Sequence, residues 1–306
     1  MRTHFWFPST ALFLLFTATA TTSAQEAAPV ALPQTDAEKQ SPIIRVLDDQ
    51  KKNDQAMYSY ERLERVETRK NAGDPQPLTV KISRVVPAGT GIDHIPVGPG
   101  GKPTEPDAYR AALAKLEKTL AWAAQDGIAQ QEAYAKVAKK RKDREELIDA
   151  ARTAFLFSFL GCEPRAERML LKYSMVPNPA YKPSSRSTSL YTRVRGTVWI
   201  DESSGQLARI EGQVIEDISL GLFLAKIYKG SHFMQERYEF APGLWFPSFS
   251  QYDFDGRKFF MSFSLHERTF YSNYRFLGPP KQALATIRAE LDRADLGQSG
   301  STVADP

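Results

Sequence analysis

The chain offers little sulfur or imidazole chemistry. It has one cysteine and four histidines in 306 residues. A single thiol cannot form an intramolecular disulfide or a metal site that needs several cysteines, and Cys162 is expected to be buried as a small apolar residue. His94, His232 and His266 stand singly, without the spacing of a metal site or of a base beside a nucleophile. We therefore predict no metal site and no cofactor.

The motifs of the common enzyme classes are absent as well. The sequence has no G-x-S-x-G elbow, no H-E-x-x-H pair and no G-x-x-x-x-G-K-[ST] phosphate loop. Residues 98–102 (GPGGK) begin like a phosphate loop, but Pro103 removes the hydroxyl ligand and the start of the helix. Glu61, Glu64 and Glu67 lie on a charged strand, where pairing with nearby arginines is expected. We predict that the protein is not an enzyme.

Charge of one sign is not in excess. There are 40 Lys+Arg against 36 Asp+Glu, which gives a formal net charge of +4. The basic run 139–142 is followed by Asp143, Glu145 and Glu146 at a spacing that allows pairing along a helix. This pattern indicates a solvated helix face, so we predict no nucleic-acid partner.

Long apolar runs are missing except at the N-terminus. Arg2 precedes a mostly apolar run over 5–16, and Thr22-Ser23-Ala24 supplies the small residues of a signal-peptidase site. The run is shorter than the roughly 20 residues that span a bilayer, which disfavours the alternative of a membrane anchor. We predict a signal peptide over 1–24, cleaved after Ala24, and an exported chain.

Strand signals and aromatic residues are plentiful. Of the 18 Phe, 12 Tyr and 4 Trp, 15 lie between Phe233 and Phe276. Strand patterns recur about every ten residues with turn signals between them, which is typical of an antiparallel meander that curls into a barrel or a bent sheet. The predicted strands cover 58–69, 78–86, 92–97, 155–160, 167–176, 194–201, 206–215, 223–229, 232–240, 244–254, 258–265 and 268–276, with turns at 202–205 and 255–256.

Helical patterns interrupt the strands in three places. Ser41 as N-cap and Pro42 at the first helical position predict a short helix. Between 102 and 153, apolar residues at three- and four-residue steps predict a helical hairpin, with Thr104 as its first cap. A last helix is predicted over 281–293. The domain plan is then a flexible lead-in at 25–40, one folded domain at 41–294 with the insertion 102–153, and a disordered tail at 295–306.

Alternation places one set of apolar residues on a common face of the sheet. Two interpretations are open. Helices can simply pack on this face, or they can cover it incompletely and leave a cavity the size of an acyl chain. The residues that would line the cavity are Val198, Ile200, Ile210, Val214, Phe259, Met261, Phe263 and Leu265.

One hairpin carries a family resemblance. The segment 196–201 (GTVWID), followed by 204–211 (SGQLARIE), resembles the W-I-D…L-x-R-I hairpin of the outer-membrane lipoprotein carrier superfamily, the LolA/LolB-like and RseB-like periplasmic proteins. The resemblance runs in broken blocks from Met57 to Phe276. Further blocks are 58–61 (YSYE), 177–183 (PNPAYKP), 229–231 (KGS) and 245–247 (WFP).

The resemblance implies an α+β fold, an incomplete antiparallel β-barrel of about eleven strands with capping helices and an apolar interior for acyl chains. The polar group of the carriers' pocket would then be Arg62 or Arg65. The implied function is a periplasmic binding module for a hydrophobic ligand, with a lipid or an acylated lipoprotein as partner. The alternative is an envelope protein-interaction or sensing module with a filled barrel, acting through the 102–153 hairpin. We expect a monomer in either case.

Overall fold

The computed structural model describes residues 36–220 and 225–299. The predicted signal peptide and its cleavage after Ala24 lie outside these residues. Contacts divide the chain into two compact units. The first unit consists of Met1–Asn53, Thr68–Leu78 and Arg144–Arg268, and the second of Asp54–Glu67, Thr79–Asp143 and Thr269–Pro306.

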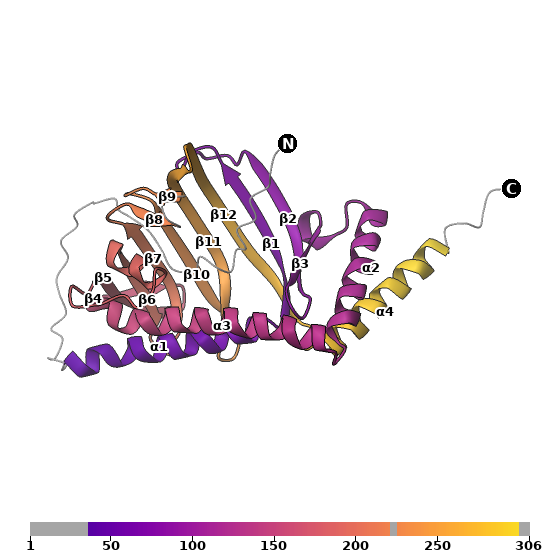
Figure 1. Ribbon diagram of the computed structural model, residues 1–306, viewed down its shortest axis with the longest axis horizontal. Helices are drawn as coiled ribbons and strands as arrows, with labels where there is room; N and C mark the ends of the chain where they lie inside the picture. Colours follow the sequence, from indigo (N-terminus) through magenta and orange to yellow (C-terminus); the bar gives the residue numbers. More distant parts are fainter. Residues whose placement is uncertain (1–35, 221–224, 300–306) are drawn as a thin grey trace. The chain divides into compact units, whose positions relative to one another are not determined.

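The strands form one open antiparallel sheet, labelled in Figure 1. Its order is β3-β2-β1-β12-β11-β10-β7-β6-β5-β4, with β9 pairing β11 and β8 pairing β9. The prediction of an α+β fold with an incomplete barrel is confirmed, and the described residues form twelve strands where the resemblance implied about eleven. The strands are β1 (Tyr60–Arg69), β2 (Thr79–Pro87), β3 (Ile92–Pro96), β4 (Phe155–Arg165), β5 (Arg168–Pro177), β6 (Val194–Asp201), β7 (Leu207–Val214), β8 (Ile218–Leu220), β9 (Ala225–Ile227), β10 (His232–Ala241), β11 (Leu244–Lys258) and β12 (Met261–Phe276). The helices are α1 (Asp36–Met57), α2 (Pro106–Ala123), α3 (Ile128–Ala154) and α4 (Pro280–Ser299), with 3-10 turns η1 (Pro99–Gly101) and η2 (Thr188–Arg193).

The core of the first unit lies between one face of the sheet and two helices. α1 contributes Ile43 and Val46, and the last turns of α3 contribute Ala151 and Ala154. Alternation in β6, with valine, glycine, valine and isoleucine at every second position from 194 to 200, supplies the matching apolar face. Each aliphatic side chain buried in this way contributes about 1.5–3 kcal/mol.

The core of the second unit packs helix on helix and helix on sheet. Leu113, Leu116 and Leu120 are fully buried on one face of α2 and meet Ala283 and Ile287 of α4. Both helices predicted within 102–153 form, and the apolar face of α2 packs on α4. α3 meets the end of α2 through Tyr134, whose hydroxyl donates to the Ala123 carbonyl at 2.9 Å.

The helix ends differ from the prediction. α1 begins at Asp36, before the expected start at Ser41, and therefore contains Pro42. Glu105, not Thr104, is the N-cap of α2, and its side chain makes no capping hydrogen bond. α4 continues past Arg293 to Ser299, so part of the expected tail at 295–306 is helical.

One turn is also misplaced in the prediction. Asp255-Gly256 lies inside β11, where Gly256 pairs with Ile227 of β9, and the turn falls at Phe259-Phe260. A Cβ on Gly256 would lie 2.1 Å from the Lys226 carbonyl oxygen. Glycine is therefore required here by the close approach of β9, and its presence did not signal a turn.

No helix among the described residues is long and apolar enough to cross a membrane. Cys162 lies on β4, at the edge of the sheet, and is exposed. The expectation of a buried thiol is therefore wrong.

Candidate functional site

Six of the eight predicted lining residues meet on one apolar face in the first unit. Val198, Ile200 and Val214 are 6%, 0% and 0% exposed. Ile210, Phe263 and Leu265 are partly buried and pack against the same cluster. Val198 of β6 and Ile210 of β7 share this face because the strand register places them directly opposite each other.

The other two predicted lining residues lie elsewhere. Phe259 is 51% exposed and Met261 72% exposed, at the tip of the β11–β12 hairpin. The sequence pattern grouped them with Phe263 and Leu265 because it assumed a strand that begins at Lys258. Phe259 instead lies in the turn. Met261 is the first residue of β12, where it alternates with Phe263 and Leu265 but lies outside the buried cluster. The structure therefore corrects the assignment of both residues to the cavity lining.

Two helices cover the apolar face. α1 and α3 run side by side in Figure 1, and ion pairs join them at Lys51–Asp149, 2.5 Å, and Arg152–Asp48. The helices contribute Ile43, Val46, Ala151 and Ala154 to the buried cluster, and Leu47, Leu147 and Ala150 pack against it. The cover is therefore held by this apolar contact and by partly exposed ion pairs, which contribute little free energy each.

The end of α1 is fixed to the sheet by one asparagine. The Asn53 side chain is 3% exposed. It donates to Gln206 Oε1 at 2.8 Å and accepts from the Trp245 backbone N–H at 3.1 Å. Because a buried amide is costly without partners, these bonds fix the position of the helix end.

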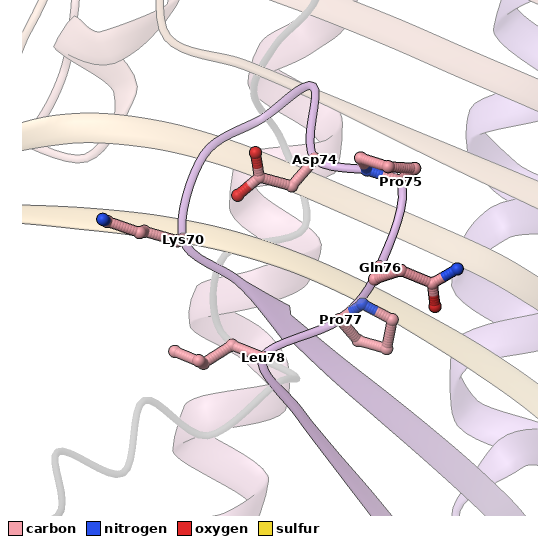
Figure 2. Close-up of a pocket in the computed structure, with 6 residues that line it drawn as sticks. All are labelled: Lys70, Asp74, Pro75, Gln76, Pro77 and Leu78. Carbon is pink, nitrogen blue, oxygen red and sulfur yellow. The ribbon is translucent and has the colours of Figure 1, made fainter.

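A pocket of about 300 Å³ lies in the loop between β1 and β2, shown in Figure 2. Its wall is a single stretch of chain, and none of the eight predicted residues takes part. Asp74 accepts hydrogen bonds from the Asn71 side chain and backbone, which hold the pKa of its carboxyl below the usual value. Its acidic group is thus used by the loop itself. The lining consists of Lys70, Asp74, Pro75, Gln76, Pro77 and Leu78.

The two candidate pocket arginines differ sharply. Arg62 is 5% exposed and its Nη2 lies 2.6 Å from Glu64 Oε1. Burial lowers the pKa of Arg62, but Glu64, Tyr274 and Tyr271 outweigh it, so the pKa is raised and the guanidinium stays charged. Arg65 is half-exposed, pairs with Glu67 and lies over the Phe270 ring at 5.4 Å. Arg62 is therefore the enclosed arginine of the pair.

A second buried arginine in the same unit was not predicted. Arg84 of β2 donates to Glu61 of β1 at 2.8 Å, to Tyr109 of α2 at 2.6 Å and to Glu290 of α4 at 2.7 Å. Burial lowers the pKa of Arg84, but the carboxylates raise it well above its usual range. No local motif could signal this cluster, because its members are spread over 61–290.

Two histidines that stand alone in the sequence meet at one carboxylate. Asp253 accepts from His232 Nε2 and lies beside His266 Nδ1, both at 3.0 Å. Arg268 and Gln251 also donate to it, at 3.0 and 2.7 Å. Burial raises the pKa of Asp253, but these donors outweigh it and hold the pKa far below its usual value. Within the described ranges no group of His, Cys, Asp or Glu could hold a metal ion.

Three solved structures resemble the fold. A LolA superfamily protein from Nitrosomonas europaea aligns with a TM-score of 0.34 and 10% identity, over 79% of this chain and 96% of that one. A structure described as an outer membrane lipoprotein-sorting protein domain from Vibrio parahaemolyticus has a TM-score of 0.26 and 11% identity, over 76% and 93%. A DUF1329 family protein from Desulfovibrio piger has 0.28 and 10%, over 77% and 93%.

No protein-family model and no curated protein matches the chain. The function is therefore argued from the chain's own residues.

Proposed function

We propose that the protein is an exported, periplasmic binding module for a hydrophobic ligand, a lipid or the acyl chain of a lipoprotein. The observation that carries the proposal is the apolar face of the first unit, which collects Val198, Ile200, Val214, Ile210, Phe263 and Leu265 beneath α1 and α3. Each ligand methylene buried against this face would contribute about 0.8 kcal/mol.

The cover supports an opening motion. α1 contributes Ile43, Val46 and Leu47 to the apolar cluster, and its pairs with α3 are partly exposed, with Lys51 at 23% and Asp149 at 49% side-chain exposure. Exposed pairs of this kind contribute about 0–1 kcal/mol each. Displacing α1 would expose the apolar face to an entering acyl chain, and it would require breaking the buried hydrogen bonds of Asn53 as well as these ion pairs.

A filled core is the second candidate. Ile200 and Val214 are 0% exposed beneath side chains of the protein itself, an arrangement that suits an envelope protein-interaction or sensing module. Such a module would bind its partner through the helices of 102–153. If the core is filled, the apolar face only stabilises the fold and binds no ligand.

A fluorescent fatty-acid probe tests the proposal. The chain, matured by its host, is titrated with cis-parinaric acid, and protein from a lipid-containing host is weighed by native mass spectrometry. We expect saturable binding and a lipid adduct. Folded protein without adduct and without probe binding would contradict the proposal and leave the filled-core candidate.

Loosening the cover sharpens the test. Lys51→Ala with Arg152→Ala removes the pairs between α1 and α3, and we expect faster probe entry. Lys139→Ala is the matched control, because it breaks an exposed pair with Asp143 within α3. Equal entry rates in both variants would show that α1 is not the cover of a ligand site.

A further inference from the structure

The hairpin tip between β11 and β12 presents three apolar side chains to solvent. β11 ends at Lys258 and β12 begins at Met261, which leaves Phe259 and Phe260 as the turn. Phe260 is 99% exposed, Met261 72% and Phe259 51%. Exposed phenyl rings forgo the burial that makes aromatic residues favourable. The tip is thus an apolar knob that the chain itself leaves open.

The backbone of this turn favours another residue type. Phe259 has a φ of +52°, a conformation that is an outlier for a bulky residue. Two-residue hairpin turns with a positive φ at the first position favour glycine. Other hairpin connections of the chain place glycine at their positive-φ positions, Gly205 at +69° and Gly243 at +76°. Phenylalanine at 259 therefore works against the turn, and its side chain is 51% exposed.

Two cationic residues at the end of β11 precede the knob. Residues 256–265 contain Arg257 and Lys258 and no acidic residue. The register places Arg257 opposite Lys226 of β9, and like charges opposite each other weaken an antiparallel pair. Asp217 partly offsets this, because its carboxylate lies 2.7 Å from Lys226 Nζ. The closeness of Arg257 and Lys226 is electrostatically unfavourable in the protein alone, and contact with a negatively charged surface would relieve it.

Asp255 is the acidic residue nearest the tip in the sequence, and its carboxylate accepts a hydrogen bond from the Ser264 hydroxyl at 2.5 Å. The Lys258 ammonium lies 6.0 Å from the centroid of the Phe259 ring, so one cation is held directly beside the apolar surface. Aromatic residues with adjacent lysine or arginine are the chemistry of a bilayer interface, where rings enter between headgroups and cations meet lipid phosphates.

We propose that this tip, residues 257–261, docks the protein on an anionic bilayer surface, with Phe259, Phe260 and Met261 entering the headgroup region and Arg257 and Lys258 on the phosphates. The proposal goes beyond ligand binding, because it does not require that the core of the first unit accepts a ligand. A protein partner would need a groove shaped to the knob, whereas a fluid bilayer accepts it without one.

Vesicle flotation tests the proposal. The full chain, matured by its host, is mixed with vesicles of phosphatidylcholine and phosphatidylglycerol in a three-to-one ratio, and with vesicles of phosphatidylcholine alone. We expect flotation with the anionic vesicles that weakens several-fold without phosphatidylglycerol and at high salt. Phe259→Gly with Phe260→Ser should reduce partitioning at least about tenfold. This double variant keeps the fold, because it supplies the residue that the turn favours.

Two controls make the readout specific. Phe260→Trp keeps an interfacial aromatic and should retain flotation. Ile128→Ser removes another exposed apolar side chain, 78% exposed on α3, and should change nothing. In a Cys162→Ser background, an environment-sensitive fluorophore on Phe260→Cys should shift to the blue with anionic vesicles, while the same label on Ile128→Cys should not.

Three results would overturn the proposal. One is unchanged flotation of the Phe259→Gly, Phe260→Ser variant. Another is equal binding to vesicles with and without phosphatidylglycerol. The third is a dimer in solution that this variant converts to a monomer, together with no vesicle binding by the original chain, since the knob would then join two copies.

Discussion

The Nδ1 atom of His266 lies 3.0 Å from Oδ1 of Asp253, at a carboxylate that is 2% exposed. His232 reaches the other oxygen of the same carboxylate from β10, also at 3.0 Å. A single buried negative charge on β11 thus joins side chains from three strands. This relationship makes the stability of the first unit depend on the ionisation of Asp253.

Asp253→Asn is expected to lower the free energy of unfolding by about 3 kcal/mol at neutral pH, because Arg268 is left without its counter-charge. The folded-state pKa of Asp253 is depressed. Its contribution is therefore complete above the unfolded value near 3.9 and is lost as the pH falls from there toward the folded-state pKa. Urea unfolding should show the two proteins converging below about pH 4. The exposed Asp143→Asn serves as the control and should change stability little; a constant difference at all pH values would contradict the assignment.

Arg84→Met should destabilise the second unit by about 3–5 kcal/mol, because it leaves the Glu61 and Glu290 carboxylates without their shared cation. Tyr109→Phe removes two hydrogen bonds of the cluster, one from Arg84 and one to Glu290, and should cost about 2 kcal/mol. Both are measured by urea unfolding. Arg288→Met, which breaks a pair that is 56% exposed on the arginine side, should cost less than about 1 kcal/mol. Equal losses at Arg84 and Arg288 would show that burial does not matter here.

Gly196→Ala should destabilise the β6–β7 pairing strongly. A Cβ at this position would lie 2.0 Å from the backbone oxygen of Glu211, and the residue opposite is Gly212. The strands must separate to admit it, so we expect a melting temperature lower by several degrees. Gly73→Ala is the matched control, because nothing lies within 4 Å of a Cβ there. An unchanged melting temperature for Gly196→Ala would contradict the close strand approach.

Phe263→Asp and Phe260→Asp separate ligand binding from membrane docking. Phe263 packs against the apolar cluster, whereas Phe260 is 99% exposed at the tip. We expect Phe263→Asp to weaken cis-parinaric acid binding at least about tenfold while leaving vesicle flotation intact. Phe260→Asp should do the reverse. Loss of both properties in one folded variant would mean that the two sites are not independent.

Local chemistry made much of the fold predictable. The β6–β7 hairpin was predicted from alternation and from Gly205 at its turn, and Gly205 takes the left-handed φ of +69°. Asp201 supports this turn by accepting from the Ser203 and Ser204 side chains. All of these contacts lie within a few residues, so the sequence pattern contains them. The pairs Arg62–Glu64 and Arg65–Glu67 along β1 were predictable for the same reason.

The sequence by itself determined the strand-rich α+β class, the positions of most strands and the apolar character of Val198, Ile200 and Val214. Only the tertiary structure decided that Gly256 lies inside a strand against β9, that Phe259 lies in the turn, and that Met261 is exposed at the start of β12. It also decided that His232 and His266 share Asp253, and that α2 packs on α4. The physical reason is that periodicity and turn chemistry act over a few residues, whereas these contacts join segments far apart in the chain, where backbone approach and burial set the outcome.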